Sequence, residues 1–232
     1  FDPESLDYVY KAVNNIKSSL PEEIPLIGFC GSPWTLAAYS IEGRSSKDFE
    51  KTLGFLESNQ KDVHDLLTKY TDACFLYLRK QVQSGADVIQ IFDSWANLLT
   101  KEDLIEYSFN YINSLISALK LDPITKNIPV IIFARNPKCN IEELINTSAD
   151  CISLFWSMND LNFEVAKNKV AIQGNLDPKI LLESDETIKR ETYKILERFK
   201  EYPGYIFNLG HGITPDISPN KIKYLTNIVR EF

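Results

Sequence analysis

The chain has 232 residues, with 25 lysines and arginines against 32 aspartates and glutamates, which gives a formal net charge of −7 at pH 7. Hydrophobic residues make up 44% and charged residues 25%, which is ordinary for a globular protein and excludes a disordered chain, a collagen-like repeat and a disulfide scaffold. The acidic balance argues against nucleic acid as the main partner, because phosphate binding needs a concentrated basic face.

Short apolar runs alternate with amphipathic stretches along the chain. The first amphipathic stretch begins at Asp2-Pro3, a capping residue followed by proline at the first helical position. A second helix is predicted over residues 63–78 and ends before Gly85. Further helix starts are predicted at Thr100, Asn140 and Ser218. The apolar runs are continuous, as in parallel strands covered on both faces; they are Ile24–Cys30, Asp87–Asp93, Ile128–Ala134, Cys151–Trp156, Val170–Asn175 and Tyr205–Gly210.

Strand followed by helix, six times over, predicts an α/β protein with a parallel sheet. A doubly wound nucleotide-binding sheet should carry a glycine fingerprint after a strand, and the chain has none. A (β/α)8 TIM-type barrel instead has polar, reactive residues beyond the carboxyl ends of its strands, as here at Ser94, Arg135 and His211. We therefore predict such a barrel, truncated to about six strand–helix units, as a single domain over residues 1–232.

Six strands do not close a barrel of this type, and the chain opens with a helix. We therefore expect the first two strand–helix units to lie upstream of Phe1. Without them the strands beginning at Ile24 and Tyr205 would be unpaired apolar edges, which favour aggregation. The alternative is an open sheet of six strands.

The four cysteines, Cys30, Cys74, Cys139 and Cys151, form no Cys-x-x-Cys pair, so we interpret them as reduced thiols of a cytoplasmic protein. We expect no metal site, because neither histidine lies at ligand spacing from a cysteine. No apolar run approaches the roughly 20 residues of a membrane span, and no signal segment opens the chain. A soluble protein without a membrane segment is predicted.

His211 follows an apolar strand and lies between Gly210 and Gly212, which let the backbone turn sharply and approach a ligand. A histidine at a barrel strand end is a candidate site residue, with a purely structural role as the alternative. His64 lies within a predicted helix among charged neighbours and is interpreted as a solvated surface residue.

Ser94, between Asp93 and Trp95, lacks the Gly-x-Ser-x-Gly elbow of a nucleophilic serine. Hydrogen-bond donation to an anionic substrate is the favoured role, with helix capping as the alternative; Asp93 and His211 could complete a triad if the fold brought them together. Tyr39 lies in a stretch crowded with glycine, proline and tryptophan, which indicates a shaped pocket wall. Its phenol would bind a carboxylate or anchor the loop. The stretch Gln173–Pro178 is either a similar wall or an ordinary strand-to-helix turn.

Five stretches, in the same order along the chain, resemble the uroporphyrinogen decarboxylase family: Pro25–Gly43 (PLIGFCGSPWTLAAYSIEG), Gly85–Ala96 (GADVIQIFDSWA), Ile128–Ala134 (IPVIIFA), Val170–Pro178 (VAIQGNLDP) and Tyr205–Gly212 (YIFNLGHG). The resemblance implies a homodimeric (β/α)8 barrel that removes the four acetate carboxyl groups of uroporphyrinogen III, giving the coproporphyrinogen III of haem biosynthesis, without metal or organic cofactor.

The family's substrate-contacting tyrosine, serine and histidine match Tyr39, Ser94 and His211, which we expect to converge on the rim of one cavity wide enough for a tetrapyrrole. The family's arginine-rich motif and catalytic aspartate have no counterpart, and we expect them upstream of Phe1. No catalytic residue is therefore predicted within residues 1–232, and these residues alone are expected to be inactive.

Three positions depart from the family pattern: Phe155 stands where an aspartate is expected, Asn97 replaces a glycine, and Asn136-Pro137 replaces a glycine-containing turn. Two other functions stay open. A corrinoid or thiol methyltransferase of the same superfamily would carry a zinc-binding His-x-Cys, but Ile213 occupies the cysteine position. A non-catalytic binding relative is suggested by Phe155.

Overall fold

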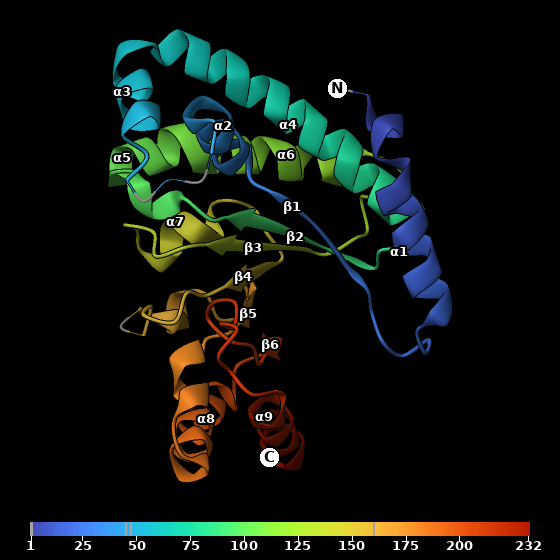
Figure 1. The fold of residues 1–232 in the computed structure, drawn as a ribbon, viewed down its shortest axis with the longest axis vertical. Helices are drawn as coiled ribbons and strands as arrows, with labels where there is room; N and C mark the ends of the chain where they lie inside the picture. The colour runs from blue at the N-terminus through green and yellow to red at the C-terminus, as the bar shows by residue number, and fades with distance from the viewer. Residues whose placement is uncertain (1, 45, 47, 160) are drawn as a thin grey trace. The chain divides into compact units, whose positions relative to one another are not determined.

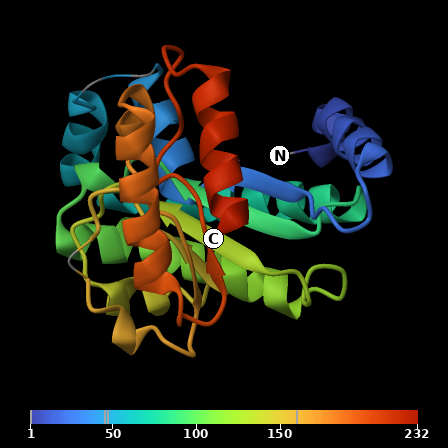
Figure 2. The ribbon, with the colours of Figure 1, turned by 90° about the horizontal axis from the view of Figure 1, so that it is seen from below.

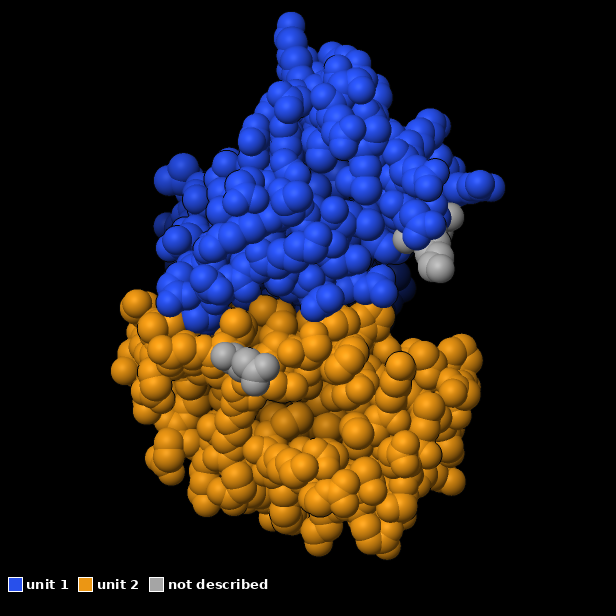
Figure 3. Space-filling model, turned by 90° about the vertical axis from the view of Figure 1, so that its left-hand side faces the viewer, with its two compact units in different colours: residues 1–150 blue, residues 151–232 orange. Residues whose placement is uncertain are grey.

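A computed structural model describes residues 2–44, 46, 48–159 and 161–232 of the chain. The chain divides into two compact units, Phe1–Asp150 and Cys151–Phe232, which Figure 3 shows in different colours. Each unit contains three parallel strands with helices between them. The predicted alternation of strand and helix is therefore confirmed in both.

The first unit contains β1 to β3 and the helices that connect them. Its elements are η1 (Pro3–Leu6), α1 (Asp7–Ser19), β1 (Ile27–Gly31), α2 (Pro33–Glu42), α3 (Glu50–Ser58), α4 (Gln60–Gln83), β2 (Val88–Asp93), η2 (Ala96–Leu98), α5 (Lys101–Asp103), the π-helix η3 (Leu104–Phe109), α6 (Asn110–Leu121), β3 (Val130–Ala134) and α7 (Ile141–Ile145).

β2 pairs in parallel with β1 on one side and with β3 on the other, so the carboxyl ends of all three strands meet at one edge. On the helix-facing side of this sheet, Ile89 and Ile91 of β2 are completely buried. α4 packs against β1 and β2, and α6 packs beside α4 (Figure 1). The buried leucines of these two helices, Leu67, Leu78 and Leu115 among them, complete this apolar core.

The predicted helix starts are confirmed by their caps. The Asp2 carboxylate accepts from the Glu4 N–H at 3.0 Å, and Thr100 caps α5 in the same way through the Asp103 N–H at 3.1 Å. Asn140 forms a capping box with Glu143 at the start of α7. These short polar side chains satisfy backbone N–H groups that have no partner within the helix.

The second unit contains β4 (Cys151–Ser153), η4 (Phe163–Val165), β5 (Ala171–Gln173), η5 (Pro178–Leu182), α8 (Asp185–Phe199), β6 (Tyr205–Ile206) and α9 (Pro219–Glu231). β5 pairs in parallel with β4 and with β6. α8 and α9 lie side by side (Figure 2) and enclose a core with η5, formed by Leu176, Leu181, Ile188, Ile217, Leu225 and Ile228.

Several strands are shorter than predicted. β6 ends at Ile206, whereas the sequence predicts a strand as far as Gly210. Backbone pairing nevertheless continues beyond it: Leu176 N–H donates to Asn208 at 3.2 Å, and Gly210 N–H donates to Leu176 at 2.8 Å. The predicted segment therefore does run beside β5 and its loop, although its backbone is not regular enough for a continuous strand.

A side chain covers the outer edge of β1. Backbone groups of Leu26 and Ser32 bond to β2, so Phe29, with the opposite parity, presents its N–H and C=O to the other edge. The buried Gln81 amide of α4 binds both groups, each at 3.0 Å. The Ile27 and Phe29 side chains, by contrast, are 43% and 59% exposed. Gln81 thus satisfies polar groups that a neighbouring strand would otherwise bind.

We expect Gln81→Ala to lower the free energy of unfolding of the intact protein by about 2 kcal/mol, because it leaves a partly buried N–H and C=O without their partner. Urea unfolding measures the change. Gln83→Ala, at an exposed position of the same helix, is the matched control and should cost less than about 0.5 kcal/mol. Equal costs for the two variants would contradict the interpretation of Gln81 as an edge cap.

Candidate functional site

Asp93, the last residue of β2, is completely buried and is the centre of a hydrogen-bond network. Its Oδ1 accepts from the hydroxyls of Ser32 and Thr35, both at 3.1 Å, and its Oδ2 accepts from the Ser108 hydroxyl at 2.5 Å. Ser32 is the N-cap of α2, and Ser108 lies in the π-helix. One carboxylate therefore joins the turn after β1, the end of β2 and the helical segment that follows it.

Burial raises the pKa of Asp93 above its ordinary value of 3.8, because the charged form loses its hydration. The hydrogen bonds from Ser108, Ser32 and Thr35 and from the Trp95 backbone oppose this effect without cancelling it. With both oxygens already engaged by hydroxyls, Asp93 is a structural acceptor in this unit, and the triad interpretation of Asp93 gains no support.

Ser94 follows this network directly. Its N–H donates to the Thr35 hydroxyl at 2.9 Å, which fixes the backbone at the carboxyl edge of β2. The helix-capping alternative for Ser94 is wrong, because Trp95 occupies the N-cap position of η2. Ser94 is half-buried, and no other described residue forms a hydrogen bond with its hydroxyl.

Tyr39 lies in α2 and belongs to an aromatic cluster with Trp95 and Phe49. The Tyr39 ring meets the Trp95 ring edge-on at 5.8 Å between centroids, and Phe49 packs on the same Trp95 ring at 4.3 Å. The Trp34 indole donates to the Trp95 carbonyl at 3.1 Å and holds it in place. Tyr39 stays 39% exposed, so the phenol at the end of a packed ring is accessible. Trp95 thus contacts the Tyr39 ring and directly follows Ser94 in the chain.

Arg135 adds a positive charge to this cluster. Its guanidinium lies 5.5 Å from the centroid of the Trp95 ring, and its backbone N–H donates to Asp93 at 3.0 Å. Asn136, the next residue, has a φ of 42°, a left-handed conformation that asparagine tolerates better than most residues. The departure at Asn136-Pro137 therefore keeps a turn that glycine would otherwise make.

His211 lies in the second unit, after β6, and its imidazole is exposed. The nearly buried Phe155 ring meets it edge-on at 6.0 Å between centroids. Phe155 also packs on Trp156 at 5.4 Å. An aromatic wall, rather than the carboxylate expected of the family, thus faces His211. The mutual placement of His211, Tyr39 and Ser94 stays a prediction.

Gly210 has a different role from the predicted one of letting the backbone turn sharply and approach a ligand. A Cβ at this position would lie 2.5 Å from the Trp156 Cα and 2.7 Å from its Cβ, so the close approach is to the loop after β4. Gly212, by contrast, has open space around it. The first glycine is needed for packing, and the second is not.

Asn175 and Asp177 hold the neighbouring loops. The Asn175 amide donates to the carbonyls of Phe155 at 3.2 Å and Trp156 at 3.4 Å, which positions the Phe155 wall. The Asp177 carboxylate caps η5 through the Lys179 N–H at 3.0 Å. In the stretch Gln173–Pro178, Asp177 therefore makes an ordinary strand-to-helix turn, whereas Asn175 shapes the surroundings of His211.

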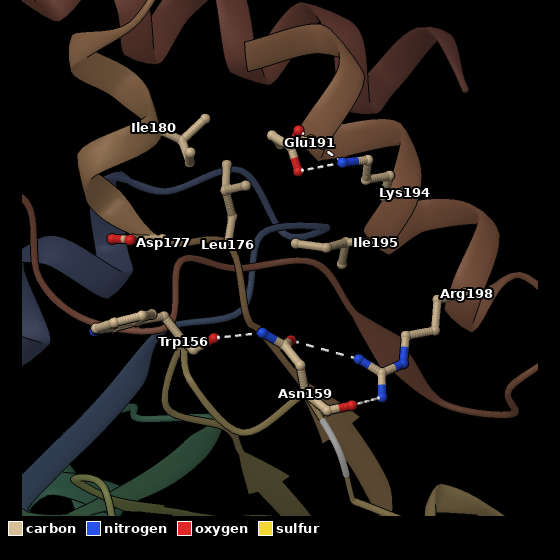
Figure 4. A pocket seen from close by; sticks show the side chains of 9 residues that line it. All are labelled: Trp156, Asn159, Leu176, Asp177, Ile180, Glu191, Lys194, Ile195 and Arg198. Carbon is tan, nitrogen blue, oxygen red and sulfur yellow. Dashed lines mark hydrogen bonds and ion pairs between the residues drawn. The ribbon is translucent and has the colours of Figure 1, made fainter. Parts of the chain in front are cut away.

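A cavity of about 400 Å³ lies in the second unit between the loops after β4 and β5 and helix α8 (Figure 4). Lys194 binds Glu191 at 2.8 Å, and Arg198 donates to the carbonyl and side-chain oxygens of Asn159. Lys194 and Arg190 also lower the pKa of Glu191. Among the described residues, the lining holds two cations, Lys194 and Arg198, and two carboxylates, Asp177 and Glu191, so the cavity has no net positive charge for a polyanionic ligand, and we assign no substrate to it.

The remaining candidates are structural. Cys30 and Cys74 line an apolar cavity of about 320 Å³, and the hydrogen bond to Cys74 together with burial raises the pKa of the Cys30 thiol, which keeps it protonated and unreactive.

His64 is not simply solvated as predicted: its Nδ1 lies 2.7 Å from the Tyr111 hydroxyl and its Nε2 3.3 Å from Glu106.

Across residues 2–44, 46, 48–159 and 161–232, no cluster of three or more histidine, cysteine, aspartate or glutamate side chains is arranged to hold a metal ion. Nor does any helix in the described part of the chain have the length and apolar character needed to cross a membrane.

The partners of Asp93 could not be identified from the sequence. Ser32 and Thr35 lie 61 and 58 residues away from it along the chain. The sequence does show an acidic residue at the end of an otherwise apolar strand. Such a residue needs hydrogen-bond donors around it if it is buried.

We expect the difference in unfolding free energy between the wild-type protein and Asp93→Asn to depend on pH. Because the pKa of Asp93 is raised by folding, the protonated form stabilises the native state fully below 3.8, and this stabilisation is lost as the pH rises through the raised pKa. Wild-type stability relative to the variant should therefore fall as the pH rises from 3.8, by at most about 1.4 kcal/mol per pH unit. Urea unfolding at a series of pH values measures it, and a constant difference would contradict the assignment.

Gly210→Ala should destabilise the protein by about 3 kcal/mol and displace the His211 loop, because the new methyl group meets the Trp156 backbone. Gly212→Ala, two residues further on, is the control and should change stability by less than about 0.5 kcal/mol. Thermal unfolding measures the stability of both variants, and Gly210→Ala should have the lower melting temperature. Similar melting temperatures would mean that the close approach at Gly210 is unimportant.

The family profile and the curated relatives give the same family. The family profile described as Uroporphyrinogen decarboxylase (URO-D) matches residues 1–232. A protein named uroporphyrinogen decarboxylase from Ruthia magnifica is 42% identical over 229 residues, which is 98% of this chain and 66% of the relative. A protein of the same name from Aquifex aeolicus is 40% identical over 232 residues, covering 100% of this chain and 67% of the relative. The chain thus spans about two thirds of the length of these relatives.

Among solved structures, a methyltransferase from Methanosarcina mazei superposes with a TM-score of 0.75 at 20% identity, covering 97% of this chain and 64% of the other. A B12-independent methionine synthase from Shewanella gives a TM-score of 0.63 at 15% identity, covering 96% and 66%. Such low identities carry information on the fold alone. The predicted fold class, α/β of the (β/α)-barrel type reduced to about six units, is confirmed. Because the profile covers the chain from end to end and the relatives are about 40% identical over nearly all of it, the chain belongs to the uroporphyrinogen decarboxylase family.

Proposed function

We propose that the protein containing this chain is a uroporphyrinogen decarboxylase, which converts uroporphyrinogen III into coproporphyrinogen III. The observation that carries the proposal is the match of all 232 residues to the family profile, together with 42% identity to a relative of that name. The methyltransferase alternative has less support, because the likeness to a methyltransferase is limited to the fold and Ile213 stands where a zinc-binding cysteine would be needed.

The proposed reaction occurs four times, and each time –CH2–COO⁻ plus one proton becomes –CH3 plus CO2. The electron pair of the broken C–C bond needs an acceptor. A pyrrole that is protonated on the ring carbon bearing the acetate is a cation and accepts this pair itself. The protein then has to supply a proton, stabilise the cationic ring and hold the remaining carboxylates.

In this proposal Tyr39, Ser94 and His211 hold the substrate by hydrogen bonds. Tyr39, which is 39% exposed, packs on the Trp95 ring, and Ser94 precedes Trp95 just after the end of β2, which supports a shared role for them. His211 lies exposed on the loop after β6. The family's catalytic aspartate and arginine motif have no counterpart in residues 1–232, so no catalytic residue is assigned among them.

A homodimer and a cytoplasmic location complete the proposal; the first follows from the family resemblance and the second from the unpaired cysteines. A non-catalytic binding relative is the second candidate, favoured by Phe155, because an aromatic ring faces His211 where the family has a carboxylate. Turnover by the full-length protein separates the two functions.

In the full-length protein, Tyr39→Phe, Ser94→Ala and His211→Asn should each lower kcat/KM for uroporphyrinogen III by about 10- to 100-fold without abolishing turnover, because each removes one oriented hydrogen bond. Chromatography of the oxidised porphyrin products measures the rates. Tyr8→Phe, at a tyrosine 69% exposed in α1, is the matched control and should have no effect.

Residues 1–232 by themselves should show no turnover. If the full-length wild-type protein binds the porphyrin but releases no CO2, the binding relative is favoured. If all three site variants retain the wild-type rate, the assignment of these residues is wrong.

A further inference from the structure

We propose that Arg135 binds a carboxylate of the tetrapyrrole substrate and is a determinant of its affinity; this inference rests on the proposed function. Arg135 is the first residue after β3, at the edge of the sheet where β1 and β2 also end. Its N–H bonds to the Asp93 carbonyl at 3.0 Å, so the backbone that carries the side chain is fixed to β2.

The guanidinium is positioned by an aromatic platform. It lies 5.5 Å from the centroid of Trp95, whose ring packs on Phe49 at 4.3 Å and whose carbonyl is held by Trp34. A guanidinium over an indole face is attracted by the ring's electrons, while its N–H groups point outward in the plane of the fork. The contact therefore orients the cation without using up its donors.

The charge of Arg135 is not neutralised by a neighbouring acid. Within the described ranges no carboxylate forms an ion pair with Arg135, whereas Arg79 is paired with Asp122 at 3.0 Å and Arg190 with Glu191 at 2.9 Å. Asp93 is close in the chain fold, but the hydroxyls of Ser32, Thr35 and Ser108 occupy its oxygens, and burial raises its pKa. Arg135 therefore keeps its attraction for an external anion.

Two hydroxyl-bearing residues adjoin the same tryptophan as Arg135. Tyr39 contacts the same Trp95 ring, and Ser94 precedes Trp95 in the chain. A guanidinium fork binds a carboxylate through two parallel hydrogen bonds, and hydroxyl groups can complete its remaining acceptor positions. In a chain of net charge −7, a substrate with eight carboxylates needs localised cations rather than a generally basic surface.

The turn after Arg135 keeps the side chain at this edge. Asn136 has a left-handed backbone conformation, and Pro137, which is buried, has a restricted φ. Lys138 follows in the same loop but is exposed. It offers a cation three residues away that lacks the aromatic platform, and so provides a matched control.

The test uses the full-length protein with two readouts. Oxidised uroporphyrin III, which carries eight carboxylates and is not turned over, is titrated by its quenching of protein fluorescence, and uroporphyrinogen III is used for steady-state kinetics. Arg135→Met should weaken uroporphyrin binding and raise KM by about 10-fold or more, with kcat within about 3-fold of the wild type. Arg135→Lys should recover part of the loss, because it restores the charge without the planar fork.

Lys138→Met should change both Kd and KM by less than about 2-fold, and the salt dependence of Kd should be shallower for Arg135→Met than for the wild type. Circular dichroism confirms that the variants are folded. Equal Kd values for Arg135→Met and Lys138→Met, or a loss confined to kcat, would overturn the inference. Arg135-dependent binding in a wild-type protein without turnover would refute the proposed reaction alone, whereas turnover independent of Arg135 would refute this inference alone.

Discussion

A single buried carboxylate organises the carboxyl edge of the first unit's sheet. Asp93 accepts from Ser32, Thr35 and Ser108, which come from α2 and its cap and from the π-helix. Burying a carboxylate is unfavourable unless donors surround it, so the three segments are held together for as long as Asp93 stays inside. This network fixes the backbone of Ser94 and so positions Trp95, the next residue. Trp95 in turn contacts Tyr39 and Arg135.

In the second unit, close packing rather than a buried carboxylate fixes the candidate site residue. Gly210 approaches the backbone of Trp156 more closely than any side chain would allow, and the Asn175 amide binds the carbonyls of Phe155 and Trp156. This contact positions His211, the residue that follows Gly210. The position of His211 thus depends on the lack of a side chain at Gly210. The candidate residues of the first unit depend instead on the Asp93 carboxylate, whose two oxygens both accept hydrogen bonds.

Aromatic residues contact the candidate site residues in each unit. In the first unit the Trp95 ring contacts the Arg135 guanidinium and the Tyr39 ring, and in the second unit the Phe155 ring contacts the His211 imidazole. Oriented rings exclude water and position polar groups without competing for hydrogen bonds. In the first unit, an anionic ligand beside Trp95 would meet the Arg135 guanidinium, because the Asp93 carboxylate is buried and already satisfied.

The sequence by itself determined the alternation of strands and helices, the helix caps at Asp2, Thr100 and Asn140, and the candidates Tyr39, Ser94 and His211, because periodicity, capping and strand-end chemistry are local. Only the tertiary structure decided what these residues contact. Ser32 and Asp93 are 61 residues apart, Gly210 meets Trp156 rather than a ligand, and Ser94 is not a cap. Contacts between segments distant in the chain depend on the three-dimensional packing of whole elements, which no local pattern encodes.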